Sequence, residues 1–423
     1  MGEIRPGLIL LAGASVVLPD RVETATVVVE SGRIVELPAG PRAVGGRERR
    51  IDLTGHVIVP GFVDVHAHGV LGVDGLDGEG AVRRVAEALP RFGVTAFCPT
   101  SVACPPSSLA TFLTEVGHLR RLPASGARVL GAHLESNFLN PDYAGAQPVG
   151  CLRTVSHDRL GVRGADEARD EDEDGTPFSG RDVLDVIDRH RADVSIVTLA
   201  PEVPGAAALV RELAEAGVRV SLGHTAASYE QAAQAFADGA RRVTHLFNRM
   251  PPFAHRHPGL VGAALTTDGV SVEVIGDGRH VHPAGVRLAV AAKGRDGVMA
   301  ITDATAGAGL AAGAVVRLGG RTITVGDVAR LDDGTVAGSV LTMDRAFGTL
   351  VSACGLDLVE AAHLCATTPA REMGLVGHGA LVPGAVADLV VLDSALRVVQ
   401  TWISGRPVWQ ARRAEPDQPP PAA

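Results

Sequence analysis

The sequence has almost no lysine, and this scarcity limits the chemistry that the chain can perform. Lys293 is the only lysine among the 423 residues, so the other basic side chains that are charged at neutral pH are arginines. A phosphate-binding loop with its lysine, a lysine Schiff base and a carbamylated lysine between two metals would each have to use this one residue. The sequence therefore disfavours these three kinds of site.

Cysteine pairs, long apolar runs and an excess of positive charge are also absent. The five cysteines form no C-x-x-C pair and are odd in number, which favours buried thiols in a reducing compartment over a disulfide framework. No apolar run reaches the roughly 20 residues that span a bilayer. A formal net charge of −9 argues against a surface for nucleic acid or for an anionic membrane, since either needs a basic face. We therefore expect a cytoplasmic protein that binds neither nucleic acid nor a membrane.

What is present indicates a globular protein with a large core. Hydrophobic residues make up 46% of the chain, and the glycines and prolines separate apolar segments without clustering. Residues 8–53 show short β-branched runs broken by turn residues, which predicts a small β module. From Val57 onward, apolar strands alternate with alanine-rich segments of helical period, the pattern of a parallel β/α architecture.

Eight strands are predicted in the β/α region, which is the number that closes a (β/α)8 TIM-like barrel. They span residues 57–66, 94–99, 128–134, 194–199, 218–223, 242–245, 271–275 and 298–302. We expect a small β-sandwich domain built from both chain ends, with residues 1–58 and 379–410 as its two parts and the metal-dependent barrel over 59–378. The acidic run 166–174 is interpreted as a solvated insertion, and 411–423 as a disordered tail.

Polar side chains gather at the predicted strand ends, where a β/α barrel builds its active site. Strand alternation places Asp64, His66 and His68 on one face at the end of the first strand. Other strands end in His133-Leu134-Glu135, Gly223-His224, Thr244-His245 and Thr302-Asp303. Unpaired buried polar groups cost about 1–3 kcal/mol each. Their joint occurrence therefore points to a shared site and not to core packing.

These residue types suit a hydrolytic metal centre. Imidazole and carboxylate ligands favour zinc first, with manganese, iron or cobalt as substitutes. Glu135 can bridge two metals through its two oxygens, and no lysine lies at a strand end to do so. Asp303, on the last strand, is suited to take a proton from water and later pass one to a leaving amine. A bound metal would bring the pKa of water toward about 7.

The same residues belong to longer motifs that resemble the amidohydrolase superfamily, and within it the N-acetylglucosamine-6-phosphate deacetylases. The similarity runs from Leu11 to Trp409. Its motifs are residues 60–69 (PGFVDVHAHG), 198–202 (TLAPE), Gly223-His224-Thr225, 244–248 (THLFN) followed by Arg256 and Pro258-Gly259, 277–281 (DGRHV), Thr302-Asp303-Ala304 and Ala337-Gly338-Ser339.

The resemblance implies hydrolysis of the linear amide in an N-acetyl amino-sugar 6-phosphate, for example N-acetylglucosamine 6-phosphate to glucosamine 6-phosphate and acetate. It implies that Glu135, His224 and His245 hold the principal metal and that Asp303 is the general base. A second metal would use His66, His68 and the shared Glu135, giving one or two Zn²⁺ per subunit.

The resemblance also implies where the substrate binds. Asn248, Arg256 and His280 match positions that bind the sugar phosphate, and guanidinium and imidazole groups suit a phosphate dianion. In relatives the arginine reaches the neighbouring subunit's site, so a homodimer is implied, with Arg256 completing the adjacent site.

The sequence departs from the family at several positions near this site. Ser136-Asn137 stand where Gly-Pro is usual, and Gln147 stands where a histidine commonly polarises the substrate carbonyl. An amide still donates a hydrogen bond, whereas losing such a donor outright can cost about 10²–10³ in rate. Arg249 occupies a usually small position and adds positive charge beside the phosphate site. Gln147 and Arg249 are therefore further substrate-binding candidates.

Three alternatives stay open at this stage. The chain could deacetylate a different or an unphosphorylated N-acetyl sugar. It could be another amide hydrolase of the superfamily, such as a cyclic-amide or ureide hydrolase, although these typically carry a carbamylated lysine on strand four, which here reads VSIVT over 194–198. It could also be an inactive sugar-phosphate-binding relative, which the full set of ligands together with Asp303 disfavours.

Overall fold

The computed structural model describes residues 7–40, 48–155 and 177–411. The predicted acidic insertion 166–174 lies outside these residues, as does the predicted tail apart from residue 411. Within the described ranges, no helix combines the length and the apolar character needed to cross a membrane. The five cysteines are all buried and free, which confirms their interpretation as buried thiols.

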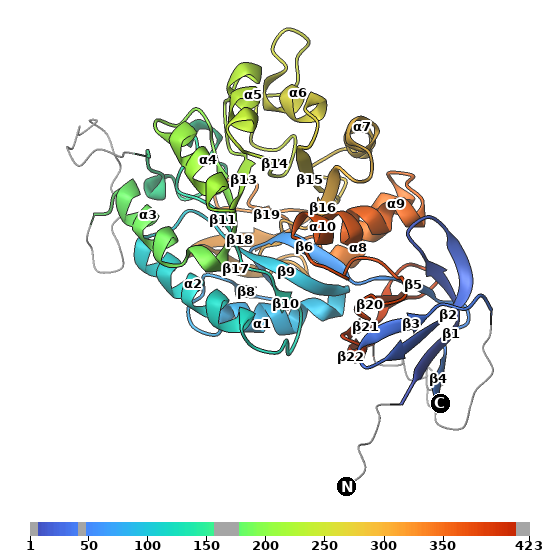
Figure 1. The fold of residues 1–423 in the computed structure, drawn as a ribbon. Helices are drawn as coiled ribbons and strands as arrows, with labels where there is room; N and C mark the ends of the chain where they lie inside the picture. The colour runs from blue at the N-terminus through green and yellow to red at the C-terminus, as the bar shows by residue number, and fades with distance from the viewer. Residues whose placement is uncertain (1–6, 41–47, 156–176, 412–423) are drawn as a thin grey trace, which may run out of the picture.

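A parallel barrel forms the larger part of the molecule (Figure 1). Its strands, in spatial order, are β6 (Phe62–Ala67), β9 (Val94–Ser101), β11 (Ala132–Glu135), β12 (Val194–Leu199), β13 (Arg219–Leu222), β14 (Arg242–Val243), β15 (Ser271–Ile275) and β16 (Val298–Ile301). A parallel bridge between Ala67 and Ala304 joins the last strand to the first, and Asp303 N donates to His66 O at 3.0 Å. The short β10 (Arg128–Val129) pairs with β9 just before β11 does so, and both lie within or at the end of the predicted strand 128–134. These strands confirm the predicted TIM-like barrel.

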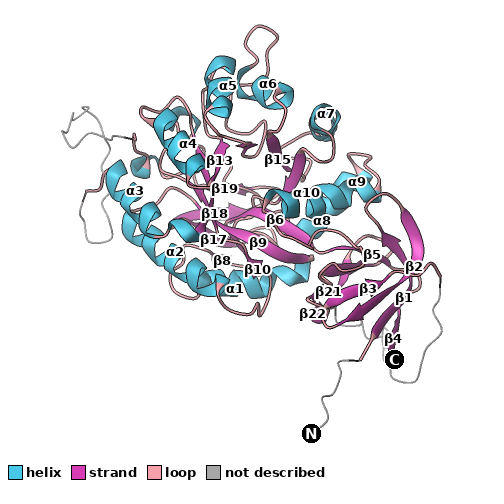
Figure 2. Cartoon of the chain, viewed as in Figure 1, coloured by secondary structure: helices cyan, strands magenta, loops and turns pink. Residues whose placement is uncertain are grey.

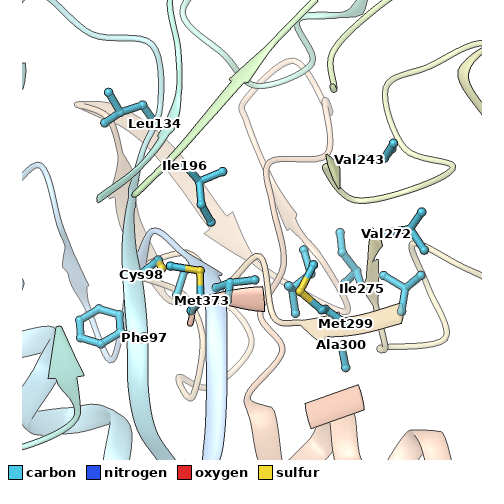
Figure 3. Close-up of a cluster of buried hydrophobic side chains, with 14 of the residues drawn as sticks. Phe97, Cys98, Leu134, Ile196, Val243, Val272, Ile275, Met299, Ala300 and Met373 are labelled. Carbon is cyan, nitrogen blue, oxygen red and sulfur yellow. The ribbon is translucent and has the colours of Figure 1, made fainter. Parts of the chain in front are cut away.

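The barrel strands are buried because both of their faces are covered, as in parallel sheets generally. Every residue of β12 and of β15 is buried. Figure 3 shows part of this core, with Ile196 of β12, Val272 of β15 and Met299 of β16 among the side chains drawn. The apolar runs that predicted these strands are therefore the packing surface of the barrel.

Helices surround the barrel (Figure 2). Ser179 caps the N-terminus of α3, and Ser228 caps the N-terminus of α5. Each serine forms a capping box with the residue three positions later, Asp182 for α3 and Gln231 for α5. The α-helices are α1 (Ala81–Ala88), α2 (Pro106–Arg120), α3 (Gly180–Arg189), α4 (Ala206–Glu215), α5 (Tyr229–Ala237), α6 (Gly259–Thr266), α7 (Pro283–Lys293), α8 (Met343–Ser352), α9 (Leu358–Ala362) and α10 (Thr368–Glu372), with a π-helical turn over His363–Thr367 and 3₁₀ turns over Leu89–Phe92, Pro141–Tyr143, Val149–Cys151 and Arg191–Asp193.

The predicted first strand, residues 57–66, is two strands in the structure. β5 (Val57–Pro60) pairs with β1 and β20 of a different sheet, and β6 starts at Phe62 in the barrel. Gly61 lies between them, where a Cβ would overlap the side chain of Thr95 on β9. The prediction of one strand was wrong because both strands are buried, so the apolar pattern continues across the break.

The two chain ends form the second sheet. Its order is β22 (Arg406–Gln410), β21 (Val398–Ile403), β20 (Leu389–Leu392), β5, β1 (Ile9–Val17), β2 (Val22–Glu30) and β3 (Arg33–Glu36), with β4 (Arg49–Asp52) against β1. A bridge joins Arg33 on β3 to Val386, just before β20, and the sheet surrounds a separate core that contains Leu11, Ile34 and Trp402. This confirms a β-sandwich built from both chain ends, seen in Figure 1 as blue and red strands side by side.

Truncating Trp402 tests how much this second core contributes to stability. Trp402 is one of the largest fully buried side chains, and its Nε1 donates to Gln400 Oε1 at 2.9 Å. We expect Trp402→Ala to lower the free energy of unfolding by about 3–5 kcal/mol through the cavity it leaves. Denaturant unfolding followed by circular dichroism measures the change. Trp409→Ala, at a half-buried position on β22, is the matched control and should cost clearly less; equal losses would contradict the prediction.

A smaller sheet lies beyond the end of β16. It consists of the antiparallel strands β17 (Val315–Leu318), β18 (Arg321–Val325) and β19 (Ala329–Arg330). A hairpin of β7 (Gly69–Val70) and β8 (Val73–Asp74) follows β6, and Gly319 N donates to Asp74 Oδ2 at 2.8 Å, which ties the two together. Both elements therefore stand next to the carboxyl ends of the barrel strands.

Candidate metal centre and active site

Three of the predicted metal ligands converge on one point. Glu135 ends β11, and His224 and His245 each lie two residues beyond the ends of β13 and β14. Glu135 Oε1 lies 3.1 Å from His224 Nε2 and 3.0 Å from His245 Nε2, and the two Nε2 atoms are 3.0 Å apart. All three side chains are buried. The three ligand atoms are therefore close enough to coordinate a single cation.

A second group lies beside the first. His66 Nε2 is 3.3 Å from His68 Nε2, and Asp303 Oδ1 is 3.3 Å and 3.2 Å from these two nitrogens. Glu135 connects the groups, since its Oε1 lies 3.6 Å from His66 Nε2 and its Oε2 lies 3.6 Å from His68 Nε2. The structure thus brings the candidate bridging carboxylate between the two groups of ligands.

Backbone strain marks the same residues. His224, His245 and Asp303 have φ values of 47°, 32° and 49°, in the left-handed region that non-glycine residues rarely adopt. Such conformations cost about 1–3 kcal/mol each and persist where the surrounding structure fixes them, frequently at functional sites. Here each strained residue lies two positions beyond the end of its barrel strand, where the candidate site residues gather.

The electrostatics of the site favour a bound cation. Burial would lower the pKa of His66, but the carboxylates of Asp303 and Glu135 outweigh it and raise this pKa to about 10. Burial would raise the pKa of both carboxyl groups, yet neighbouring imidazoles lower them, chiefly His224 and His66 for Glu135 and His66 for Asp303. The two carboxylates therefore stay ionised, and their negative charge favours a positive charge between them. A divalent metal would supply that positive charge, so the residues present fit a divalent metal.

His133 has a different role from the ligands around it. Its Nδ1 lies 3.0 Å from Val65 O, and its Nε2 lies 2.7 Å from Thr198 Oγ1. Burial and the neighbouring His66 lower the pKa of His133 to about 3, so its ring is neutral. A neutral ring that donates through Nδ1 and accepts at Nε2 has no lone pair left for a metal. His133 therefore links β11 to β6 and β12 by hydrogen bonds inside the barrel and is not a candidate metal ligand.

A cavity of about 610 Å³ opens above the ligands, within the size range of small-molecule sites. Its wall includes four of the five substrate-binding candidates, namely Gln147, Asn248, Arg249 and His280. The fifth, Arg256, does not line this cavity and is exposed on a turn closed by the Ala254–His257 bridge. Sequence reasoning missed Arg279 and Arg330, which also line the cavity and add positive charge.

His280 is prepared to bind an anion. Its Nδ1 lies 2.6 Å from Asp277 Oδ2, and Asp277 Oδ1 accepts the backbone N–H groups of Arg279 and His280 at 2.8 Å each. Burial would lower the pKa of His280, but the hydrogen bond and the charge of Asp277 raise it. His280 Nε2 is buried and has no partner among the described residues. Because Asp277 accepts the Nδ1 hydrogen, protonation of His280 places a second N–H on Nε2, where it can bind a negatively charged group in the cavity.

The residues that depart from the family fall into two kinds. Ser136 Oγ donates to Thr198 O at 2.7 Å, and Asn137 Nδ2 donates to Cys104 O and Cys151 O at 2.9 Å and 2.7 Å. These two residues therefore anchor the buried loop that follows Glu135. Gln147 instead contacts the ligand set, since its Oε1 accepts from Ala103 N at 2.8 Å and its Nε2 donates to Glu135 Oε2 at 2.5 Å.

Comparison with known proteins agrees with this geometry. Residues 57–408 match the family model described as Amidohydrolase family. The chain belongs to the amidohydrolase family. Members of this family are metal-dependent hydrolases of amide bonds, and the two groups of buried ligands in this amidohydrolase match that requirement.

Individual relatives extend along most of the chain. The protein is 34% identical over 368 residues to the N-acetylgalactosamine-6-phosphate deacetylase of Escherichia coli O157:H7, covering 86% of this chain and 90% of the relative. It is 36% identical over 410 residues to the N-acetylglucosamine-6-phosphate deacetylase of Mus musculus, covering 92% of each. Among solved structures, a mutant of the Mycobacterium smegmatis N-acetyl-D-glucosamine-6-phosphate deacetylase, in complex with N-acetyl-D-glucosamine-6-phosphate, gives a TM-score of 0.82 at 31% identity and covers 95% of this chain and 99% of that one.

Proposed function

We propose that this amidohydrolase releases acetate from an N-acetylhexosamine 6-phosphate, with N-acetylglucosamine 6-phosphate as the first candidate. The proposal rests on one cavity that holds candidate metal ligands on its floor and candidate phosphate-binding groups on its wall. The floor holds Glu135, His224 and His245 beside Asp303, and the wall holds His280, whose pKa is raised by Asp277 and whose Nε2 is buried without a partner among the described residues. The E. coli relative named for the galactosamine phosphate makes that epimer the second candidate.

The groups on the wall would bind the phosphate end of the substrate. His280, Asn248 and Arg249 all line the cavity, and Arg249 lies over Gly145, where any larger side chain would overlap the guanidinium. Charge-assisted hydrogen bonds from imidazolium and guanidinium groups are strong phosphate contacts. Holding the phosphate at the wall would direct the acetamide toward the floor of the cavity.

The groups on the floor would perform the hydrolysis. Glu135, His224 and His245 would hold the principal metal, most favourably Zn²⁺, and His66 and His68 would hold a second ion shared through Glu135. When bound, the metal supplies Lewis acidity that polarises the acetyl carbonyl and makes water more acidic. Asp303, kept ionised by its imidazole neighbours, would take a proton from the attacking water. As the C–O bond forms and the C–N bond breaks, Asp303 would pass that proton to the nitrogen, giving acetate and a free amine.

The assay that tests this proposal measures acetate release with metal-loaded protein. N-acetylglucosamine 6-phosphate, its galactosamine epimer and the two unphosphorylated sugars form the substrate panel. We expect kcat/KM to be highest for a 6-phosphate, because the cationic wall has an anion to bind only in that case. No acetate from any of the four would sink the proposed function, and equal rates with and without phosphate would sink the phosphate assignment.

Gln147 is proposed to assist at the acetyl carbonyl. Ala103 N fixes the side-chain amide, one Nε2 hydrogen goes to Glu135, and the second hydrogen is left for a ligand in the cavity. We expect Gln147→Ala to lower kcat about 10²-fold with a smaller change in KM. Steady-state kinetics measure this split. Gln147→His, which restores a donor, should retain more activity than Gln147→Ala; the opposite order would contradict the assignment.

We further propose a homodimer in which Arg256 completes the neighbouring site. The support is its position outside its own cavity, on the exposed Ala254–His257 turn, together with the family resemblance of the motif that carries it. Light scattering of the purified protein gives the oligomeric state. A monomer that retains full kcat/KM for the phosphorylated sugar would refute this arrangement.

A further inference from the structure

A buried carboxylate lies below the metal ligands and has no part in the proposed reaction. Glu273 is the central residue of β15, where all five residues are buried, and its side chain is fully inaccessible to solvent. An ionised carboxylate in such a place is costly unless it is paired. Its presence in a strand without another charged residue therefore requires a physical reason.

The contact that Glu273 makes is with a candidate metal ligand. Glu273 Oε2 lies 3.2 Å from His66 Nδ1, the ring nitrogen opposite the Nε2 that faces His68 and Asp303. A carboxylate can only accept, so this contact places the imidazole hydrogen on Nδ1. The lone pair of a neutral His66 is then on Nε2, where a metal would need it.

No other ligand histidine in the described ranges has this support. His224 Nδ1 lies 2.9 Å from a backbone carbonyl, that of Tyr143. His68 Nδ1 and His245 Nδ1 are buried without a hydrogen-bond partner among the described residues. His66, His68 and Asp303 form the ligand group at the end of the first barrel strand, called here the strand-one group. In this group, within the described residues, only the imidazole of His66 has its orientation fixed by a hydrogen bond at Nδ1, and the acceptor of that bond is the carboxylate of Glu273.

Two neighbouring groups show that Glu273 is a support and not a ligand. His133 lies near enough to form a separate ligand cluster with His66 and Glu273, but its two nitrogens are engaged by Val65 O and Thr198 Oγ1. Arg242, fully buried on the adjacent β14, supplies positive charge near Glu273 in addition to the contact of Glu273 with His66. With His133 unavailable, this group has too few free donors to hold an ion of its own.

We propose that Glu273 is a positioning residue that sets the metal affinity of the strand-one group by fixing the orientation and the tautomer of His66. The proposal rests on the metal-binding roles assigned under the proposed function. It predicts that the strand-one group loses affinity when Glu273 is changed, whereas the group of Glu135, His224 and His245 does not. Carboxylates in this position typically change metal affinity 10–100-fold.

The test is a zinc titration of the full-length protein, stripped of metal and reloaded in competition with a chromophoric chelator. We expect Glu273→Gln, which keeps a weaker acceptor, to raise the dissociation constant of the strand-one zinc about 10-fold, and Glu273→Leu to raise it about 100-fold. The zinc held by Glu135, His224 and His245 should change less than twofold. His68→Asn, which removes a strand-one ligand, identifies which binding step belongs to that group.

Ser221→Ala is the matched control. Ser221 is a fully buried polar residue on β13, and its Oγ lies in hydrogen-bond contact with Thr244 Oγ1 at 2.6 Å. Among the described residues, it forms no hydrogen bond with a candidate metal ligand. It should leave both dissociation constants unchanged. If Glu273→Leu does not fold, as judged by circular dichroism, Glu273→Gln decides. The proposal fails if both zinc affinities fall equally, if neither changes, or if the wild type binds one zinc per chain. No substrate is needed, so a failure of acetate release with normal titrations would sink only the proposed function.

Discussion

Asp303→Asn is expected to lower kcat for acetate release by about 10²–10⁴-fold, the usual contribution of a general acid–base group. The amide keeps the size of the side chain but cannot take a proton from water. Asp303 Oδ1 lies within 3.3 Å of His66 and His68, so the substitution also removes one donor of the strand-one group. Zinc content should therefore be measured together with the kinetics, and the zinc held by Glu135, His224 and His245 should remain.

A second carboxylate of the same cavity provides the control for Asp303. Asp327 lines the cavity next to the small sheet, and its Oδ1 accepts the backbone N–H of Val328 at 3.0 Å. Asp327→Asn should change kcat only a few-fold, because this residue lies outside both groups of metal ligands. An Asp303→Asn variant that keeps more than a tenth of wild-type kcat would refute the assignment of Asp303 as the general base.

Glu135→Gln is expected to abolish zinc binding and to reduce kcat/KM by more than about 10⁴-fold. Glu135 Oε1 lies between His224 and His245, and Oε2 faces His68, so one substitution removes charge from both groups. Without this carboxylate, Asp303 alone faces the four imidazoles from the cavity side, and their mutual repulsion on protonation disfavours the assembled site. Inductively coupled plasma mass spectrometry of the dialysed protein measures the zinc content.

Glu202→Gln is the control for Glu135. Its carboxylate accepts from Asn140 Nδ2 at 2.8 Å and from Ala226 N at 2.6 Å, and so links the loops that follow β11 and β13, the strands on either side of β12. It should alter stability without removing zinc. If Glu135→Gln still bound one zinc per chain with wild-type affinity, the bridging role would be wrong.

Much of the fold could be predicted because burial leaves a clear pattern. Parallel barrel strands are covered on both faces, so their apolar runs stand out from the alanine-rich helices that follow them. The same reasoning gave the location of the site, since Glu135, His224 and His245 each end or follow a strand and parallel strands end at one rim. Periodicity does not show the break at Gly61, because the requirement for glycine comes from Thr95 on another strand.

The parts of the site that sequence reasoning missed are contacts between residues far apart in the chain. Glu273 was detectable only as one charged residue inside an apolar strand, and nothing local indicates that it meets His66. The hydrogen bond from Gln147 to Glu135 depends on the path of the loop past Ala103. For Ser136-Asn137, the sequence indicated a different loop, and the structure adds that these side chains hold it from within.

The division of residues 57–67 between two sheets links the sandwich to catalysis mechanically. β5 is hydrogen-bonded to the chain-end strand β20, whereas β6 carries His66 and pairs with β9 of the barrel. Only Gly61 separates β5 from β6. Separating β5 from β20 would displace β6, the strand that carries the candidate ligand His66. The sandwich therefore holds the amino end of β6, and an isolated barrel fragment that begins at Phe62 would lack this attachment for its first strand.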